Sequence, residues 1–286
     1  MVARVDFPVG SPADFEELRR RFTGLPLRPK LMQGREAGTD ISSPGRQSLT
    51  LLIGEETAGA MYATDVYLSP GFGAPSHHQP TEDELWYLLE GELDVRVGAQ
   101  RMKIRAGAFA YIPRDTTHAF RNNAAAPAHL LAWNSPGGHE RAFEEMGRLA
   151  KQGITAFPDL RDMFHRHGVE LHADESHFAR NDHAAGPKVV HASSPGAGVR
   201  RLLSAEESRG DFEVTEQRVE AGASIERREE ASELCLYVLE GNVQLTVGDD
   251  THAASRGAFA FVPRRTMLRA ATQGSARLLL WRTPAR

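Results

Sequence analysis

An internal repeat constrains the fold of this chain more than any other feature of its sequence. The segment Gly107–Arg114 (GAFAYIPR) recurs almost unchanged as Gly257–Arg264 (GAFAFVPR), and Tyr87–Gly91 (YLLEG) recurs as Tyr237–Gly241 (YVLEG). Both pairs are 150 positions apart, from 107 to 257 and from 87 to 237. A register that holds over several blocks indicates two copies of one fold in a single chain.

The repeated unit has the pattern of a β-domain. In the first copy, short runs rich in β-branched and aromatic residues are separated by turn-forming residues, which is typical of a sandwich or barrel. The expected strands are residues 48–53, 60–68, 84–89, 93–97, 108–112 and 129–133. We therefore predict an all-β chain with two barrels in tandem.

Helical patterns accompany the two copies. Residues 11–22 begin with a capping Ser, a Pro and acidic residues, and residues 139–150 and 159–167 carry apolar side chains at helical spacing. Residues 168–195 have no periodicity and are expected to form an irregular linker. A few short helices are therefore expected to flank the barrels.

These patterns divide the 286 residues into four segments. Residues 1–47 are expected to form a leader that wraps around the body, and residues 48–138 the first barrel. Residues 139–197 would form a helical linker and residues 198–286 the second barrel. A chain of this length is sufficient for two compact domains.

Composition excludes several classes of partner. The formal net charge is −4 and no basic block is present, which argues against nucleic acid. No apolar run approaches the length that spans a bilayer, and the first residues lack the apolar core of a secretion signal. Cys235 is the only cysteine, so an internal disulfide is excluded and a cytoplasmic location is expected.

The first copy contains side chains suited to one divalent metal ion. His77, Glu84 and His118 supply two imidazoles and a carboxylate, a composition that suits non-haem Fe(II) and leaves positions open for substrate and dioxygen. Ni(II), Mn(II), Co(II) or Zn(II) could bind the same set. Residues i and i+2 of a strand face the same side, so Gln79 is the expected fourth ligand and His78 points away, unless a bulge reverses the two.

The second copy has lost this ligand set. The 150-residue register aligns His77 with Arg227, Gln79 with Glu229, Glu84 with Leu234 and His118 with Leu268. Leucine cannot bind a metal ion, so the second barrel is expected to keep the scaffold without the metal.

The blocks around these residues resemble the paired motifs of the cupin superfamily, most closely its quercetin dioxygenase branch. The matching positions are His77, Glu84, Gly91, Gly107, Pro113, His118 and Asn122. Gln79 replaces the second His of the first motif, and Asp115 replaces a Gly of the second. The resemblance covers most of the chain. It implies a bicupin, in which each copy is a double-stranded β-helix or jelly-roll barrel.

This resemblance implies a metal-dependent dioxygenase for an enolic or phenolic small molecule of aromatic or polyketide-like character. Glu84 would be a metal ligand and the general base that takes the substrate proton. The expected substrate contacts are Met61, Trp86, Tyr111 and Phe120. A non-oxidative metal enzyme (isomerase, lyase or hydrolase) and a metal-free binding bicupin stay open as alternatives, as does a homodimer.

Seven further histidines, which lie in helical or linker segments, lack ligand spacing. We interpret them as surface residues: His139, His165, His167, His172, His177, His183 and His191.

Overall fold

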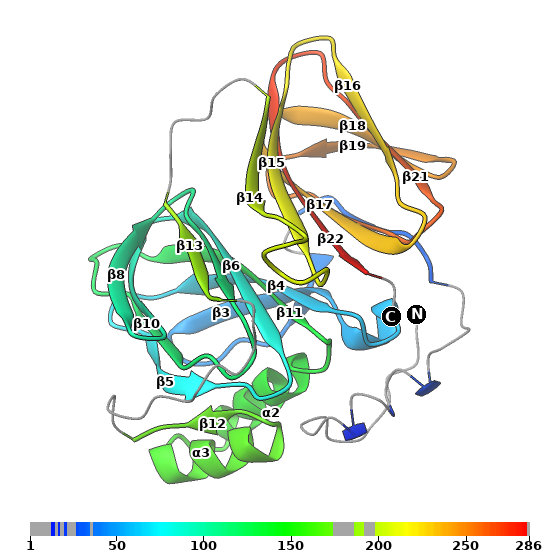
Figure 1. Ribbon diagram of the computed structural model, residues 1–286. Coiled ribbons are helices and arrows are strands. Elements are labelled where there is room, and N and C mark those ends of the chain that lie inside the picture. Colours follow the sequence, from blue (N-terminus) through cyan, green and yellow to red (C-terminus); the bar gives the residue numbers. More distant parts are fainter. Residues whose placement is uncertain are drawn as a thin grey trace. The chain divides into compact units, whose positions relative to one another are not determined.

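Antiparallel β-strands make up both halves of the chain. The computed structural model describes residues 13–14, 17, 20–21, 27–34, 37–173, 186–191 and 198–284. Contacts divide the chain into one unit of Met1–Leu25 with Thr39–Ala192 and a second unit of Pro26–Gly38 with Ser193–Arg286. Each unit contains two curved sheets (Figure 1). The prediction of an all-β chain with two jelly-roll barrels and a few short helices is confirmed.

The first barrel consists of two sheets. Seven strands form one sheet in the order β13-β9-β6-β11-β4-β3-β2, and five form the other in the order β12-β5-β10-β7-β8. The strands are β2 (Thr39–Asp40), β3 (Arg46–Leu52), β4 (Tyr62–Leu68), β5 (Gly73–His78), β6 (Asp83–Glu90), β7 (Glu92–Val97), β8 (Gln100–Arg105), β9 (Phe109–Ile112), β10 (His118–Arg121), β11 (Ala128–Ser135), β12 (Glu170–Leu171) and β13 (Lys188–Val190).

Alternate side chains from the two sheets meet in one apolar core. Its buried members are Val66, Leu68, Trp86, Leu88, Leu93, Val95, Val97, Ile104, Ala108, Ala110, Ile112, Ala128, Leu130 and Ala132. Members of one strand are mostly two residues apart, as the two-residue period of a strand requires. This alternation determines which side chains of β4, β6 and β10 face the barrel interior.

Two helices follow β11 and belong to the first unit. They are α2 (Glu140–Lys151) and α3 (Phe157–Arg166), and the rings of Phe143 and Phe164 meet edge to face with centroids 6.3 Å apart. No helix in the part of the chain that the structure describes is long and apolar enough to cross a membrane.

The stretch expected to be an irregular linker contains two short strands. Within 168–195, β12 pairs with β5, and β13 pairs with β9, so both extend sheets of the first barrel. The prediction for this stretch is corrected at these five residues. Strands of two or three residues leave no periodicity in a sequence, because the hydrogen bonds of a neighbouring strand determine them.

The expected leader has two different parts. Residues 13, 14, 17, 20 and 21 are helical, while the rest of the predicted helix, with Phe15, Leu18 and Phe22, lies outside the described residues. Further along, β1 (Lys30–Met32) pairs with β20 (Phe259–Val262) of the second unit. Part of the leader is therefore a strand of the second barrel.

The second barrel repeats the two-sheet arrangement. Its sheets have the orders β1-β20-β17-β22-β15-β14 and β16-β21-β18-β19. The remaining strands are β14 (Val199–Leu203), β15 (Glu213–Val219), β16 (Ser224–Arg228), β17 (Ser232–Glu240), β18 (Asn242–Val247), β19 (Asp250–Ser255), β21 (Met267–Ala271) and β22 (Ala276–Pro284). An apolar core of its own, with Leu236, Leu245 and Leu278, fills it.

Strand pairing preserves the 150-residue register seen in the sequence. His77 faces His118 across β5 and β10, and Arg227 faces Leu268 across β16 and β21. The turn before β10 is also repeated, because Asp115 has φ of 62° and its counterpart Arg265 has φ of 64°. Asp115 thus adopts the left-handed conformation for which its motif usually has Gly.

Candidate metal centre

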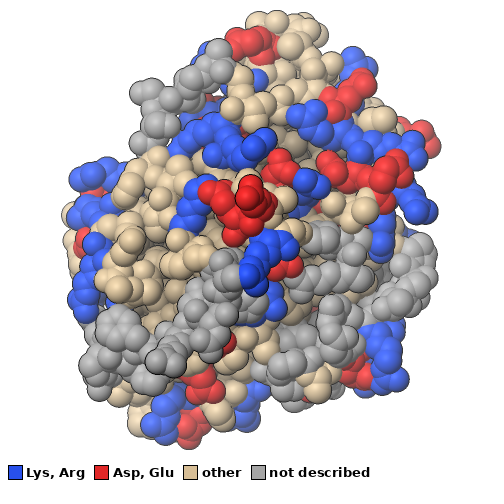
Figure 2. All heavy atoms as spheres, in the orientation of Figure 1, with Lys and Arg blue, Asp and Glu red and all other residues tan. Residues whose placement is uncertain are grey.

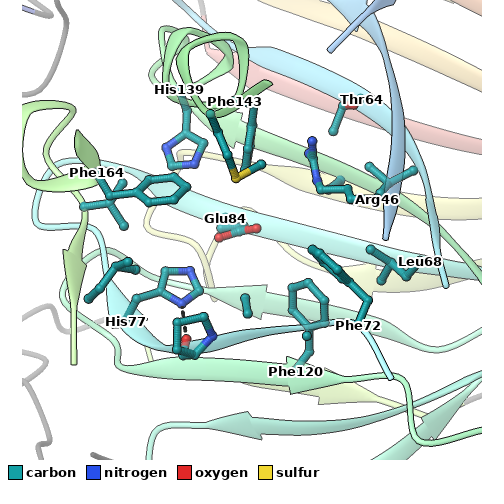
Figure 3. A pocket seen from close by; sticks show the side chains of 18 of the residues that line it. Arg46, Thr64, Leu68, Phe72, His77, Glu84, Phe120, His139, Phe143 and Phe164 are labelled. Carbon is teal, nitrogen blue, oxygen red and sulfur yellow. Dashed lines mark hydrogen bonds between the residues drawn. The ribbon is translucent and has the colours of Figure 1, made fainter. Parts of the chain in front are cut away.

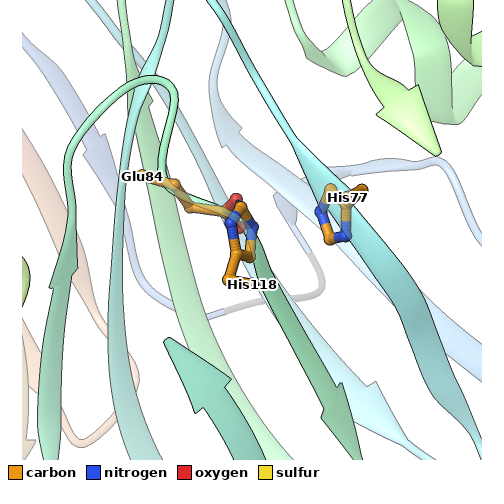
Figure 4. A group of neighbouring side chains, drawn as sticks. All are labelled: His77, Glu84 and His118. Atoms are coloured by element: carbon orange, nitrogen blue, oxygen red, sulfur yellow. The ribbon is translucent and has the colours of Figure 1, made fainter. Parts of the chain in front are cut away.

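Three strands of the first barrel bring His77, Glu84 and His118 together (Figure 4). His77 lies near the end of β5, Glu84 is the second residue of β6, and His118 begins β10. One ligand atom from each side chain lies within 4.8 Å of the others, and the two imidazole centroids are 4.1 Å apart. Among the described residues this is the single group of three or more such side chains with metal-binding geometry.

Backbone carbonyls orient both imidazoles. Nδ1 of His77 donates to the carbonyl oxygen of Pro75 at 2.8 Å, and Nδ1 of His118 donates to that of Thr116 at 2.8 Å. A carbonyl oxygen accepts only, so each ring carries its proton on Nδ1 and presents Nε2. Hydrogen bonds of this kind fix the tautomer and orientation of metal-binding histidines.

Glu84 is held by neighbours on both of its carboxylate oxygens. Trp86 Nε1 donates to Oε1 at 2.6 Å, and Gln79 Nε2 donates to Oε2 at 2.8 Å. Nε2 of His118 lies 3.1 Å from the same Oε2. Burial alone would raise the pKa of Glu84, but the hydrogen bond with His118 and the adjacent imidazoles lower it below its usual range. Glu84 is therefore an anion at neutral pH.

His77 is in turn kept neutral. Burial, together with the neighbouring His118, lowers the pKa of His77 to about 3. A neutral imidazole and an ionised carboxylate are the protonation states that a metal ion requires of its ligands.

The donor set fits a divalent transition metal. Bonds of about 2.1 Å place adjacent ligands of an octahedral ion roughly 3 Å apart, which is close to the 3.1 Å between His118 Nε2 and Glu84 Oε2. The two ring nitrogens of His118 both face oxygens that only accept hydrogen bonds, Thr116 O at Nδ1 and Glu84 Oε2 at Nε2. Without a cation, the contact with Glu84 needs a second proton on the ring. A metal ion between His118 and Glu84 would take the place of that proton. We conclude that His77, Glu84 and His118 form a candidate site for one divalent metal.

Gln79 and His78 diverge as strand alternation predicts. The Gln79 amide is buried beside Glu84, whereas Nδ1 of His78 lies 3.0 Å from Nε2 of His172. The rings of His78 and His172 stack with centroids 5.1 Å apart. Gln79 is thus available to the centre as a ligand or as a hydrogen-bond donor, and His78 is not.

A cavity of about 300 Å³ adjoins the three residues (Figure 3). Its size is at the lower end of the range for small-molecule sites. Barrel strands form one wall and the pair α2 and α3 forms another. The apolar lining includes Val66, Leu68, Phe72, Phe120, Leu130, Phe143, Met146, Phe157, Leu160 and Phe164. A mainly apolar pocket with a few convergent polar groups is typical of a ligand site.

The structure separates the four expected substrate contacts into two pairs. Trp86 and Phe120 line the cavity, but Met61 and Tyr111 do not, and this part of the prediction is corrected. Met61 precedes the lining residue Tyr62 and so belongs to the other face. Tyr111 lies between Ala110 and Ile112, which face the core, and strand alternation turns it outward.

His139 was expected at the surface and is instead buried in the cavity wall. Its Nδ1 lies 3.0 Å from Oε2 of Glu82, which also accepts from Asn134 Nδ2 at 3.3 Å. Burial would lower the pKa of His139, but the charge of Glu82 raises it. No ligand spacing marks His139, because the helix start brings it to the cavity from 55 residues beyond Glu84.

The other histidines have varied positions. His167 is buried against Glu145, which corrects its surface interpretation, and His172 is half-buried beside His78. His165 and His191 are exposed, as expected. His177 and His183 lie outside the described residues.

The equivalent place in the second barrel has no group of three metal ligands among the described residues. Leu234 and Leu268 are buried there, and Arg227 and Glu229 lie at a small charged pocket. Arg227 donates to Oε1 of Gln217 at 3.1 Å. Among the described residues, the candidate metal site is therefore found in the first barrel.

Comparison with protein families matches a cupin domain to residues 64–134. The chain is 30% identical to tetracenomycin polyketide synthase protein TcmJ of Streptomyces glaucescens over 71 residues, which are 25% of this chain and 48% of TcmJ. It is 29% identical to polyketide synthase CurC of Streptomyces cyaneus over 112 residues, 38% of this chain and 71% of CurC. The match thus spans about half the length of TcmJ.

Solved structures share the two-barrel fold. Salicylate 1,2-dioxygenase from Pseudaminobacter salicylatoxidans has a TM-score of 0.61 at 14% identity, covering 90% of this chain and 84% of that one. Oxalate decarboxylase from Bacillus subtilis has a TM-score of 0.61 at 14% identity, covering 89% and 76%. Procruciferin, an 11S globulin from Brassica napus, has a TM-score of 0.63 at 10% identity, covering 91% and 85%. Identities this low establish the fold alone.

Proposed function

This chain belongs to the cupin superfamily as a bicupin, and from that premise we propose that its first barrel is a metal-dependent dioxygenase for an enolic or phenolic small molecule. The observation that carries the proposal is the convergence of two imidazoles and one carboxylate beside a buried, largely apolar cavity. Two imidazoles and one carboxylate are the ligand set of non-haem Fe(II) sites. Three protein ligands leave coordination positions open, as in a catalytic site, whereas a structural site fills them all.

His77, Glu84 and His118 would hold the metal, with Gln79 as a fourth ligand or as the donor that orients Glu84. When bound, Fe(II) would supply a Lewis acid with open coordination positions and a one-electron redox couple. The partners in the reaction would be the small molecule and dioxygen.

Proton transfer falls to the side chains around the substrate. The ionised Glu84 can accept the hydroxyl proton as substrate docks, which makes it the proposed general base. Its low pKa disfavours keeping that proton. His139, whose Nδ1 lies 3.0 Å from Glu82 Oε2, borders the same cavity and can take or return a proton there.

The cavity walls would exclude water from the reaction. Rings from the barrel (Phe72, Phe120) and from the helices (Phe143, Phe164) enclose the space, so reactive species would be shielded from hydrolysis. Dioxygen is apolar and can enter such a space without losing hydration.

A polyketide-like substrate is favoured by the relatives. TcmJ and CurC are both described as polyketide synthase proteins, and an aromatic polyketide carries enolic or phenolic oxygens. The aromatic lining of the cavity suits a flat ring system.

Oxygen consumption tests this function. Protein reconstituted with Fe(II), and separately with Ni(II), Mn(II), Co(II) or Zn(II), is given flavonols, 1,3-diketones, naphthols and anthrones in an oxygen-electrode cell. We expect substrate-dependent oxygen uptake with at least one redox-active metal, lost in His118→Ala and retained in His78→Ala. Absence of uptake with every metal and substrate would reject the dioxygenase.

A non-oxidative metal enzyme is the second candidate, and the buried Glu82–His139 pair favours it. An imidazole that lines the cavity with a carboxyl group beside it can move protons in an isomerisation or a cyclisation, and neither reaction consumes dioxygen. Anaerobic incubation distinguishes the two: substrate conversion without oxygen supports the second candidate. Protein that retains no metal after purification without chelator would instead favour a metal-free binding bicupin.

A further inference from the structure

Arg46, the first residue of β3, carries a positive charge into the same cavity. Its side chain lines the cavity wall and only 6% of the residue is exposed. Nη1 is buried without a hydrogen-bond partner, the hydroxyl of Tyr62 lies beside the guanidinium, and no carboxylate among the described residues forms an ion pair with it. In the view of Figure 3, Glu84 is drawn between His77 and Arg46.

One face of the guanidinium is already occupied. Its central carbon lies 3.8 Å from the ring centroid of Phe143 on α2, which is a cation–π contact. Such a contact engages the flat face of the group and leaves the N–H donors along its edge. Phe143 therefore holds the plane of Arg46 while the edge stays available to a ligand.

Three other arginines of this barrel have oxygen partners, although Arg96 Nη2 and Arg141 Nε are also buried without one. Arg141 forms an ion pair with Glu55, and Arg96 donates to Gly98 O at 3.2 Å and to Ser76 Oγ at 3.3 Å. Arg114 pairs with Asp83 at 2.9 Å. A buried charge without such a partner is costly, and arginine does not escape the cost by losing its proton. Arg46 thus lacks the carboxylate partner that Arg141 and Arg114 have.

We propose that Arg46 binds a carboxylate of the substrate, so that the cavity selects an aromatic or polyketide-like hydroxy acid over its neutral analogue. The inference rests on the proposed function in that the ligand occupies the cavity beside the candidate metal centre. The guanidinium edge matches a carboxylate in shape and charge and can donate two parallel hydrogen bonds.

Charge balance supports this ligand class. Glu84 is the acidic group whose charge acts on Arg46. Glu82 Oε2 and His139 Nδ1 lie 3.0 Å apart, and this pair adds no net charge whether their shared proton is on the ring or on the carboxyl group. A divalent metal ion and Arg46 together outweigh Glu84, which leaves an excess of positive charge in a space of low dielectric constant. A ligand with one carboxylate and one ionised hydroxyl would neutralise that excess.

Calorimetric binding of two matched probes tests the role of Arg46. The probes are 3-hydroxy-2-naphthoate and 2-naphthol, which differ by the carboxylate, and the full-length protein is loaded with Zn(II) to prevent turnover. We expect wild type to bind the naphthoate roughly tenfold to a hundredfold more tightly than 2-naphthol, the range for hydrogen bonds to charged groups. Arg46→Met should abolish this preference and leave 2-naphthol affinity within about twofold.

Two variants distinguish ligand binding from packing. Arg46→Lys keeps a charge without the planar edge and should lose part of the preference. Phe143→Leu removes the ring that holds the plane of Arg46, so it should reduce the preference less than Arg46→Met does. Wild type that does not bind the naphthoate or does not prefer it overturns the proposal, as does equal weakening of both probes in Arg46→Met. Should Arg46→Met fail to fold, an unchanged preference in Arg46→Lys overturns it.

Failure of this proposal and failure of the dioxygenase proposal give different results. The preference for the carboxylate is an equilibrium measurement with a redox-inactive metal, so it does not depend on oxygen consumption. Oxygen uptake without the preference removes the role of Arg46 alone. The preference without oxygen uptake removes the dioxygenase and leaves an anion-selective cavity.

Discussion

The indole N–H of Trp86 donates to Oε1 of Glu84 across 2.6 Å, from two residues further along the same strand. Residues i and i+2 of β6 share the inner face of the barrel, so both side chains enter the cavity together. Trp86 therefore has two roles: its ring is part of the cavity wall, and its N–H orients the carboxylate.

Trp86→Phe separates these two roles. The substitution keeps an aromatic wall but removes the donor, and loss of such a supporting hydrogen bond typically weakens metal binding by about 10–100-fold. We expect a dissociation constant for Zn(II) at least tenfold higher than that of wild type, measured by competition with a fluorescent chelator. Trp133→Phe, at a buried tryptophan outside the cavity lining, is the control and should match wild type. Equal affinities for wild type and Trp86→Phe would contradict the orienting role.

Removal of single ligands should release the metal. Glu84→Ala and His118→Ala each take away one of three donors, and we expect protein purified without chelator to retain less than about a tenth of the wild-type metal by elemental analysis. His78→Ala should retain most of the metal, because the His78 ring forms a hydrogen bond with His172 and does not face the metal site. Full loss in His78→Ala with retention in Glu84→Ala would mean that a different set of side chains holds the metal.

Gln79→His tests the fourth position. The Gln79 amide lies against Glu84, so an imidazole there would add a donor to the same centre. We expect metal affinity to rise by about tenfold or more, the reverse of the loss seen when supporting partners are removed. Gln79→Ala is the comparison, and it should weaken binding. An imidazole that leaves the affinity unchanged would restrict Gln79 to orienting Glu84.

Acid should weaken the contact that Glu145 makes between α2 and the end of α3. Glu145 on α2 accepts from Arg166 and from His167, each at 2.7 Å, at the end of α3. Burial would raise the pKa of Glu145, but these two bonds lower it below 4.5, so their contribution is present above pH 4.5 and is lost as pH falls through the folded pKa. Burial also lowers the pKa of His167 below 6.5 in the folded protein. As pH falls below 6.5, the unfolded chain therefore binds a proton at His167 that the folded protein does not, and the folded state becomes less stable.

Glu145→Gln provides the measurement. We expect its melting temperature at pH 7 to fall by about 2–4 °C, for a loss of about 1 kcal/mol. The difference from wild type should shrink below pH 4.5, where wild-type Glu145 becomes protonated. Glu220→Gln removes an exposed pair with Arg218 in the second barrel and should leave the melting temperature unchanged. A difference that grows in acid would contradict this assignment.

The duplication and the strand pattern could be predicted because both can be recognised directly in the order of the residues. Nearly identical blocks 150 residues apart indicate one fold twice, and the pairing of His77 with His118 recurs between Arg227 and Leu268. The two-residue period of a strand also placed Gln79 beside Glu84 and turned His78 away. These inferences needed only the spacing of the repeat and the known geometry of a β-strand.

The remaining features depend on contacts between distant parts of the chain. His139 and Arg46 come from a helix start and from the first residue of a strand, and neither position has a distinctive spacing. Tyr111 was assigned to the cavity because of its aromatic ring, although its strand faces the core through Ala110 and Ile112. Burial of a charge such as Arg46 becomes visible only when the packing around it is known.

The matching strand register of the second barrel has a consequence for how such proteins change. Its backbone presents Arg227 and Leu268 opposite each other as the first barrel presents His77 and His118. The same strand pairing therefore holds two different sets of side chains, and a few exchanges at these positions are the shortest route by which the second barrel could gain a metal site. Twin folds of this kind let one copy preserve an activity while the other is free to lose or acquire one.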